Sequence, residues 1–162
     1  MAIAEHLALI QGSPARWQQW KSHHPHTHPD LSHAHLYGAN LDGLDCVSVN
    51  FSHANLSHAH LQGTQLSHAK LNNAIAHHAQ LSNAIAHETE FVAANLREAD
   101  LSNSDLRKAN LIGADLRGVT LCYGNLHRAN LVGANLYQAD LRHIDLYGAI
   151  AEERASELRS LV

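Results

Sequence analysis

The chain has 162 residues, 45% of them hydrophobic, and a formal net charge of −4 with its histidines neutral. This length is enough for one domain, and the mildly negative charge argues against non-specific nucleic-acid binding, which needs a basic surface. No apolar run approaches a membrane span, and the N-terminus lacks the basic start and long apolar core of a signal peptide, so we expect a cytoplasmic protein. We expect no disulfide between Cys46 and Cys122, in keeping with a reducing compartment.

The first 30 residues predict two short helices followed by a linker rich in histidine and proline. Two runs with helical spacing of apolar residues are separated by Gly12, which suits the end of a helix, and by Ser13-Pro14, which suits an N-cap and a first turn. We expect the apolar faces of these helices to cover the open end of the repeat that follows. The residues expected to form this cap are Leu7, Ile10, Trp17 and Trp20.

A repeat of five residues runs from Leu31 to Leu146 without an insertion or deletion, and 19 of its 24 central positions hold leucine. In an α-helix a step of five advances a side chain by about 140°, and in a strand an odd step moves it to the other face. All the leucines therefore point inward only if the backbone turns a corner once per unit and the resulting coils stack. Such a short period predicts a solenoid.

The central positions of the repeat are expected to form a buried ladder along the solenoid. Two of them, Phe51 and Phe91, lie forty residues apart and hence on the same side of the coil. The ladder residues are Leu36, Phe51, Leu56, Leu71, Phe91, Leu96, Leu106, Leu111, Leu116, Leu126 and Leu136.

The repeating unit, Ala-Asn/Asp-Leu-x-x, resembles the A(D/N)LXX motif of the pentapeptide-repeat family over nearly the whole chain. The stretch from Glu5 to Leu36, with its Leu-x-Leu-Ile, Trp-x-x-Trp-Lys and Pro-Asp-Leu-Ser, resembles the N-terminal leader of cyanobacterial-type members. The resemblance implies an all-β solenoid, a right-handed quadrilateral β-helix with four pentapeptides per coil and the leucine and the small residue inside. We therefore expect a helical cap and linker in residues 1–30 and about six coils in residues 31–150. Residues 151–162 have the pattern of a short C-terminal helix.

Histidine is unusually frequent, with sixteen residues in all and thirteen between His23 and His87. In a coil of four pentapeptides, residues twenty apart stack about 4.8 Å from each other, so His58, His78 and Glu98 form one column with His77 beside it. Imidazoles and a carboxylate at this spacing are candidate ligands for Zn²⁺ or Ni²⁺. Two alternatives stay open: the repeated Ser-His-Ala is a surface filler without a role, or the stacked imidazoles sense pH.

The sequence gives little support for catalysis. Serine and histidine often stand side by side, but on outward positions of a convex rod without a pocket. The paired carboxylates Asp100 and Asp105 belong to the repeat, where such residues make local turn hydrogen bonds. We therefore expect no enzyme, no catalytic residues, no cofactor and no small-molecule substrate.

The main functional hypothesis is a non-catalytic scaffold rod that binds a protein of unknown identity. Its expected partner surface combines the stacked pair Lys108 and Arg128 with the outward Tyr137, and the rod is a monomer or a homodimer without direct contact to nucleic acid or membrane. One alternative is the branch of the family whose rods imitate B-form DNA and bind DNA gyrase. This chain departs from that branch in its mild acidity, its Lys108–Arg128 column and its uninterrupted coils. The second alternative is divalent-metal binding by the histidine column.

Overall fold

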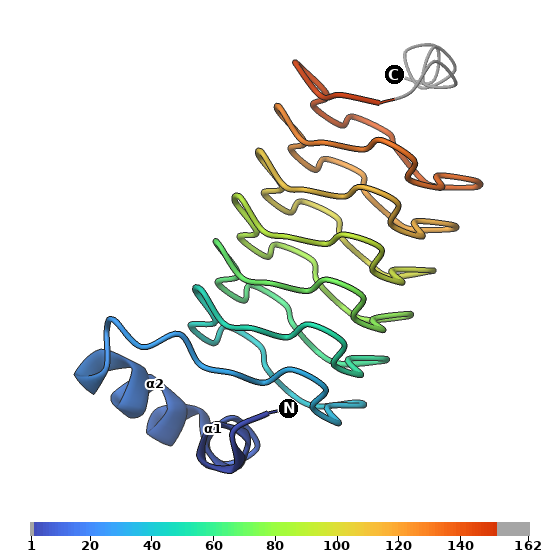
Figure 1. The fold of residues 1–162 in the computed structure, drawn as a ribbon. Coiled ribbons are helices and arrows are strands. Elements are labelled where there is room, and N and C mark those ends of the chain that lie inside the picture. The colour runs from blue at the N-terminus through green and yellow to red at the C-terminus, as the bar shows by residue number, and fades with distance from the viewer. Residues whose placement is uncertain (1, 152–162) are drawn as a thin grey trace.

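The computed structural model describes residues 2–151. Two helices lie at the N-terminal end of the molecule, and a stack of coils runs from them to the other end (Figure 1). The C-terminal helix expected in residues 151–162 lies, apart from Ala151, outside the described residues.

Both expected N-terminal helices are present. Helix α1 spans Ala4–Ile10 and helix α2 spans Pro14–His23. Ser13 is the N-cap of α2, with an extended backbone and a side chain that accepts from the amide of Arg16 at 3.4 Å. The proline that follows suits the first turn, where its missing N–H is not needed. No helix among residues 2–151 has the length and apolar character to cross a membrane.

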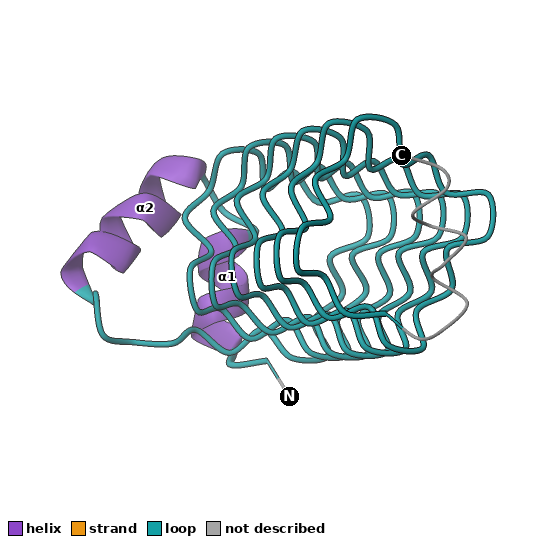
Figure 2. Cartoon of the chain, turned by 90° about the horizontal axis from the view of Figure 1, so that it is seen from above, coloured by secondary structure: helices purple, strands orange, loops and turns teal. Residues whose placement is uncertain are grey.

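The rest of the described chain is a solenoid of parallel β-bridges. Each bridging residue pairs with the residue twenty positions later, from Asp30 with Asn50 to Asn130 with Ile150. One coil therefore takes twenty residues, or four pentapeptides, and successive coils repeat the same outline (Figure 2). The chain turns every five residues, so each side of a coil contributes a single bridge instead of a longer strand.

Backbone hydrogen bonds join each coil to its neighbours at every pentapeptide. The amide of the central Leu116 donates to the carbonyl of Asn135 in the next coil at 2.9 Å, and the amide of Asp115 donates to the carbonyl of Ala94 in the preceding coil at 2.9 Å. The side chain of the Asn or Asp often supports the turn as well: Asp100 Oδ1 accepts from the amide two residues later at 2.9 Å. This is the local turn bonding expected for the repeated carboxylates.

Every turn contains one residue in the left-handed region of the backbone, with φ between 53° and 70°. Seven of these residues are glycines and seventeen are not. Among non-glycine residues, asparagine, aspartate and histidine tolerate this conformation best. Six of the histidines stand at this position: His33, His53, His58, His68, His78 and His143. The backbone of the turn therefore gives part of the reason for the high histidine content.

The interior is formed by the central residues and the small residues two places before them, as the repeat predicts. The expected ladder residues are fully buried, including both Phe51 and Phe91, except for Leu136, which is partly exposed near the end of the described coils. Cys46 also lies in this core, and burial raises the pKa of its thiol. Cys122 is partly exposed, and both cysteines are free.

Helices α1 and α2 pack on the first coil, and two side chains of α2 donate hydrogen bonds to its carbonyl groups. Trp17 is fully buried, and its Nε1 donates to the carbonyl of Asp45 at 2.7 Å. Lys21 Nζ donates to the carbonyl of Val47 at 2.9 Å. In the later coils, the corresponding carbonyl groups accept hydrogen bonds from backbone amides of the preceding coil. Of the expected cap residues, Trp17 and Ile10 are buried, and Leu7 and Trp20 are partly buried.

Candidate functional site

The outward side chains gather at the four corners of the coil, two residues per corner. Two corners carry most of the predicted functional residues. The His58 corner consists of residues 37–38, 57–58, 77–78, 97–98, 117–118 and 137–138, and the Glu88 corner of residues 47–48, 67–68, 87–88, 107–108, 127–128 and 147–148. Within one coil these corners are ten residues apart out of twenty, so they lie diagonally opposite each other.

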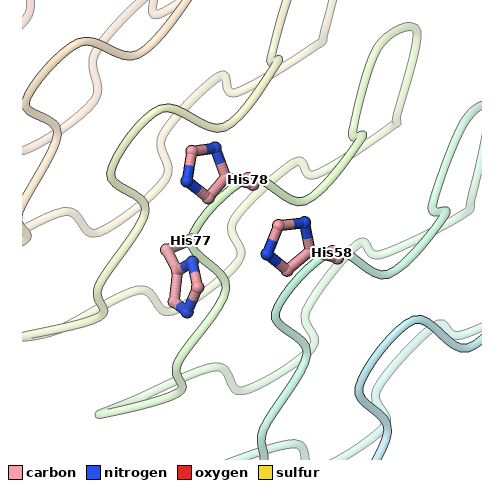
Figure 3. A group of neighbouring side chains, drawn as sticks. All are labelled: His58, His77 and His78. Carbon is pink, nitrogen blue, oxygen red and sulfur yellow. The ribbon is translucent and has the colours of Figure 1, made fainter.

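Three imidazoles meet at the His58 corner (Figure 3). His58 stacks on His78 of the next coil, with ring centroids 4.9 Å apart and an interplanar angle of 20°. His77 lies edge-on to both, with centroid distances of 5.3 Å. One ring nitrogen from each of the three residues lies within 4.8 Å of the other two. The corner therefore offers three neighbouring nitrogen ligands from two coils.

Glu98 lies at the edge of this histidine group. Its Oε2 is 3.6 Å from Nδ1 of His78, one coil below it in the same column. The sequence predicts a column of His58, His78 and Glu98 with His77 beside it; in the structure the three imidazoles form the close group, and Glu98 adjoins His78. The sequence signal for His77 was its position next to His78, but whether two consecutive side chains converge depends on the shape of the turn.

The environment of His77 disfavours its charged form. Burial lowers the pKa of this imidazole first, and the positive charges of His58, His78 and Arg97 lower it further, while Glu98 acts in the opposite direction. His77 is half-buried, and the other two imidazoles are exposed. A neutral imidazole retains the lone pair that a metal ion or a hydrogen-bond donor needs.

At the Glu88 corner a carboxylate is already engaged by a lysine. Lys108 Nζ lies 2.9 Å from Glu88 Oε1, and this hydrogen bond is the main reason that the pKa of Glu88 is lowered. His87 and His68 approach the same carboxylate at 3.3 Å and 3.4 Å. His68, twenty residues before Glu88, is therefore part of an ion-paired network. Lys108 is thus not a free cation on the surface.

The structure does not bring the three expected partner-surface residues together. Lys108 and Arg128 are successive members of one column at the Glu88 corner, whereas Tyr137 belongs to the His58 corner on the diagonal. Arg128 is exposed and makes no ion pair among the described residues. Residues 128 and 137 are not a multiple of twenty apart, so the period of the sequence already places these two side chains at different corners.

Two tyrosine–histidine stacks lie on neighbouring corners of the last described coils. Tyr147 stacks on His127 with centroids 5.2 Å apart, and His143 stacks on Tyr123 at 4.8 Å. Both tyrosines remain well exposed, at 62% for Tyr123 and 74% for Tyr147. Sequence reasoning missed these pairs, although each is separated by the twenty residues of one coil.

Three arginines of the described C-terminal coils bind carboxylates of their own turn. Each makes a two-pronged contact, through Nε and a terminal nitrogen, to the aspartate two residues before it, with distances of 2.6 to 2.9 Å. These contacts lower the pKa of the aspartates, chiefly through the arginine side-chain hydrogen bond. The pairs are Arg107 with Asp105, Arg117 with Asp115, and Arg142 with Asp140.

Comparison with known proteins gives one family match and several structural matches. The family model described as Pentapeptide repeats matches eight copies, in residues 27–55, 50–85, 87–122 and 116–150. The crystal structure of a pentapeptide repeat protein from the Arabidopsis thaliana thylakoid lumen aligns with a TM-score of 0.64 and 24% identity over 67% of this chain and 76% of that one. This match supports the solenoid fold. No curated protein sequence matches the chain significantly.

Two cyanobacterial structures match with lower TM-scores. Rfr23, a pentapeptide repeat protein from Cyanothece 51142, is 31% identical over 60% of this chain and 63% of that one, with a TM-score of 0.47. HetL from Nostoc sp. strain PCC 7120, a pentapeptide repeat protein involved in the regulation of heterocyst differentiation, is 31% identical over 78% of this chain and 61% of that one, with a TM-score of 0.37.

Proposed function

Because the chain belongs to the pentapeptide repeat family, we propose that it is a non-catalytic scaffold that binds a protein partner on the outer corners of its last coils. The finer architecture we propose is a right-handed quadrilateral β-helix of six coils in residues 31–150, with residues 1–30 as its N-terminal cap and linker. A cytoplasmic location is part of the same proposal, supported by two free cysteines.

The observation that carries this proposal is a surface we call the tyrosine–histidine patch: Tyr123, His127, Arg128, His143 and Tyr147. Its two ring stacks hold exposed tyrosines on neighbouring corners, so the aromatic surface is already ordered before a partner arrives. Tyrosine and arginine are among the residues enriched at energetic hot spots of interfaces. Ordering before binding also reduces the entropy lost when a complex forms.

The chemistry of the patch indicates the kind of partner that fits it. Arg128 is exposed and directly follows His127, which stacks on Tyr147 of the next coil at the same corner. A partner carboxylate would form a charge-assisted hydrogen bond with this group, while flat apolar or aromatic side chains would cover the tyrosine rings. We therefore propose a protein with an acidic residue beside an apolar surface.

The non-catalytic part of the proposal is supported by where the reactive side chains stand. The serines and histidines of the described coils lie largely on convex corners, and the repeated aspartates bond to their own turns. Such groups are not arranged around an enclosed space from which a substrate would exclude water.

The test is a crosslinked pull-down from the native lysate with three forms of the protein. Tyr123→Asn with Tyr147→Ser removes both patch rings, and Tyr37→Ser with Tyr137→Ser removes two equally exposed tyrosines elsewhere. Asparagine suits the left-handed φ of 59° at Tyr123. The proposal requires one stoichiometric protein that the parent and the control capture and the patch variant loses. Equal capture by all three forms would contradict the patch, and capture of gyrase would replace the proposal with the DNA-mimic alternative.

A further inference from the structure

The three imidazoles of the His58 corner have a spacing that a small movement converts into a metal site. Their ring nitrogens lie within 4.8 Å of one another. Ligand nitrogens bound tetrahedrally to zinc at about 2.0–2.1 Å are separated by about 3.3 Å. The ring nitrogens of the three residues therefore need to approach by about 1.5 Å. The rings of His58 and His78 must also turn out of their parallel stack, because an imidazole binds a metal ion in the plane of its ring; rotation about side-chain bonds provides both changes at an exposed corner. The movement requires no change of the backbone.

The backbone holds these residues in a fixed arrangement. His58 and His78 occupy equivalent places in successive coils, with φ values of 57° and 56°. The amide of His58 donates to the carbonyl of His77 at 3.0 Å, and the amide of His78 donates to the carbonyl of Arg97 at 2.9 Å. All three Cα positions are therefore fixed by the ladder between coils, so little backbone entropy is lost when the side chains bind an ion.

The ligand set defines the class of ion. Three imidazoles suit zinc, nickel or copper in the divalent state, and they leave a coordination position open to water. Glu98 lies 3.6 Å from Nδ1 of His78, so a small rotation brings its carboxylate into hydrogen-bonding contact with that nitrogen. A carboxylate in this place orients the ring and fixes which nitrogen faces the metal.

The other histidine groups of the described chain lack the combination of three close imidazoles and a neighbouring carboxylate without a lysine partner. His33 and His53 stack in parallel, with centroids 4.7 Å apart, but supply two imidazoles only. His68 and His87 lie beside a carboxylate that Lys108 already engages. At the His58 corner the nearby positive charge is that of Arg97, one coil after His77 in the same column, and it disfavours protonation of His77.

From this geometry we infer that His58, His77 and His78 bind one divalent transition-metal ion of the zinc and nickel class at the surface of the solenoid, with Glu98 orienting His78. The site is a binding function separate from the tyrosine–histidine patch, because the two occupy different corners and different coils. It does not depend on the identity of the protein partner.

The experiment is calorimetric titration of the untagged full chain with zinc chloride and, separately, nickel chloride. We expect one ion per chain. The variant His58→Asn, His77→Ser, His78→Asn removes the site with residue types that the same turn already accepts, since Asn73 and Asn83 have φ values of 57° and 59°. This triple variant should lose binding. His77→Ser alone should weaken it by at least tenfold, because two imidazoles remain.

A matched control and a spectroscopic readout complete the test. His33→Asn with His53→Asn removes a stacked histidine pair and should leave affinity and stoichiometry unchanged. Cobalt added to the parent should give the visible absorption of a nitrogen-ligated ion, which the triple variant lacks, and equal thermal melting without metal would show that the variant is folded. A parent that takes up no ion, or a triple variant that binds as the parent does, would overturn the inference.

Discussion

The indole nitrogen of Trp17 donates a hydrogen bond to the backbone carbonyl of Asp45 at 2.7 Å, and thereby joins helix α2 to the first coil. In the next coil the equivalent carbonyl, that of Gln65, accepts from the amide of Cys46 in the coil before. A side chain of the helix thus takes the place that a further coil would occupy. Gln11 does the same for the carbonyl of His35 at 3.3 Å.

The first prediction is that Trp17→Phe destabilises the start of the solenoid. The change removes the donor to Asp45 and part of a fully buried ring, so a loss of about 1–3 kcal/mol is expected. Neighbouring coils depend on one another, and the first coil should therefore lose amide hydrogen-exchange protection before the last. The control is Trp20→Phe, at a partly buried ring. Equal loss of protection in both variants would argue against a role for the indole hydrogen bond.

The left-handed turns lead to the second prediction. Ala93 is exposed and has a φ of 53°, a conformation that costs a residue with a Cβ atom about 1–2 kcal/mol. Ala93→Gly removes this cost but adds backbone entropy to the unfolded chain, so the net change should be a stabilisation of no more than about 1 kcal/mol. Ala93→Val should destabilise, because a branched Cβ fits this region worst. Urea midpoints would show the order Gly, Ala, Val; any other order would contradict the explanation.

The period of five predicted the solenoid, and the reason is geometric. A leucine at every fifth position faces inward only in a coil with a corner per unit, and residues such as Leu116 and Phe91 are buried as that argument requires. The two helices also followed from local signals, above all Ser13 and Pro14 at the start of α2. Both predictions depend on residues close to one another in the sequence, whose spacing is enough to determine the local backbone structure.

The candidate sites could be predicted only in part, because they depend on side-chain directions at the corners. The twenty-residue period placed His58 over His78, but it could not show that His77 turns toward both. The same period, applied to residue 137, would have separated Tyr137 from Arg128. The pairing of Lys108 with Glu88 was also accessible from the period.

The third prediction concerns the core. Leu116 is fully buried between coils, and Leu116→Lys places a charge where it has neither water nor a partner. The cost is several kcal/mol, enough to unfold the coils around it. Ile112→Lys is the matched control, since Ile112 is 37% exposed on an outward corner of the same coil. Circular dichroism should show early melting of the first variant only. A Leu116→Lys protein that melts like its parent would contradict an inward leucine ladder.

The fourth prediction is a loss of stability in acid that depends on the aspartate–arginine pairs. The side-chain hydrogen bond from Arg117 lowers the pKa of Asp115 below its ordinary value of 3.8, and Arg107 does the same for Asp105. A carboxyl whose pKa is lower in the folded state stabilises the fold fully above its unfolded value, and this stabilisation disappears as the pH falls through the folded value. The effect should therefore appear below pH 3.8. Since the pairs are exposed to water, which screens them, the contribution of each pair is small.

A variant that keeps the turn but removes the charge isolates this effect. Asp105→Asn with Asp115→Asn retains a side-chain oxygen for the turn hydrogen bond, as Asn95 and Asn125 show at equivalent positions. Urea midpoints should be measured at about pH 6 and about pH 3. The parent should lose more stability than the variant between these values, because the remaining carboxyls titrate equally in both. Parallel losses would mean that the arginine contacts contribute nothing to the fold, and a larger loss in the variant would contradict the direction of the pKa shifts.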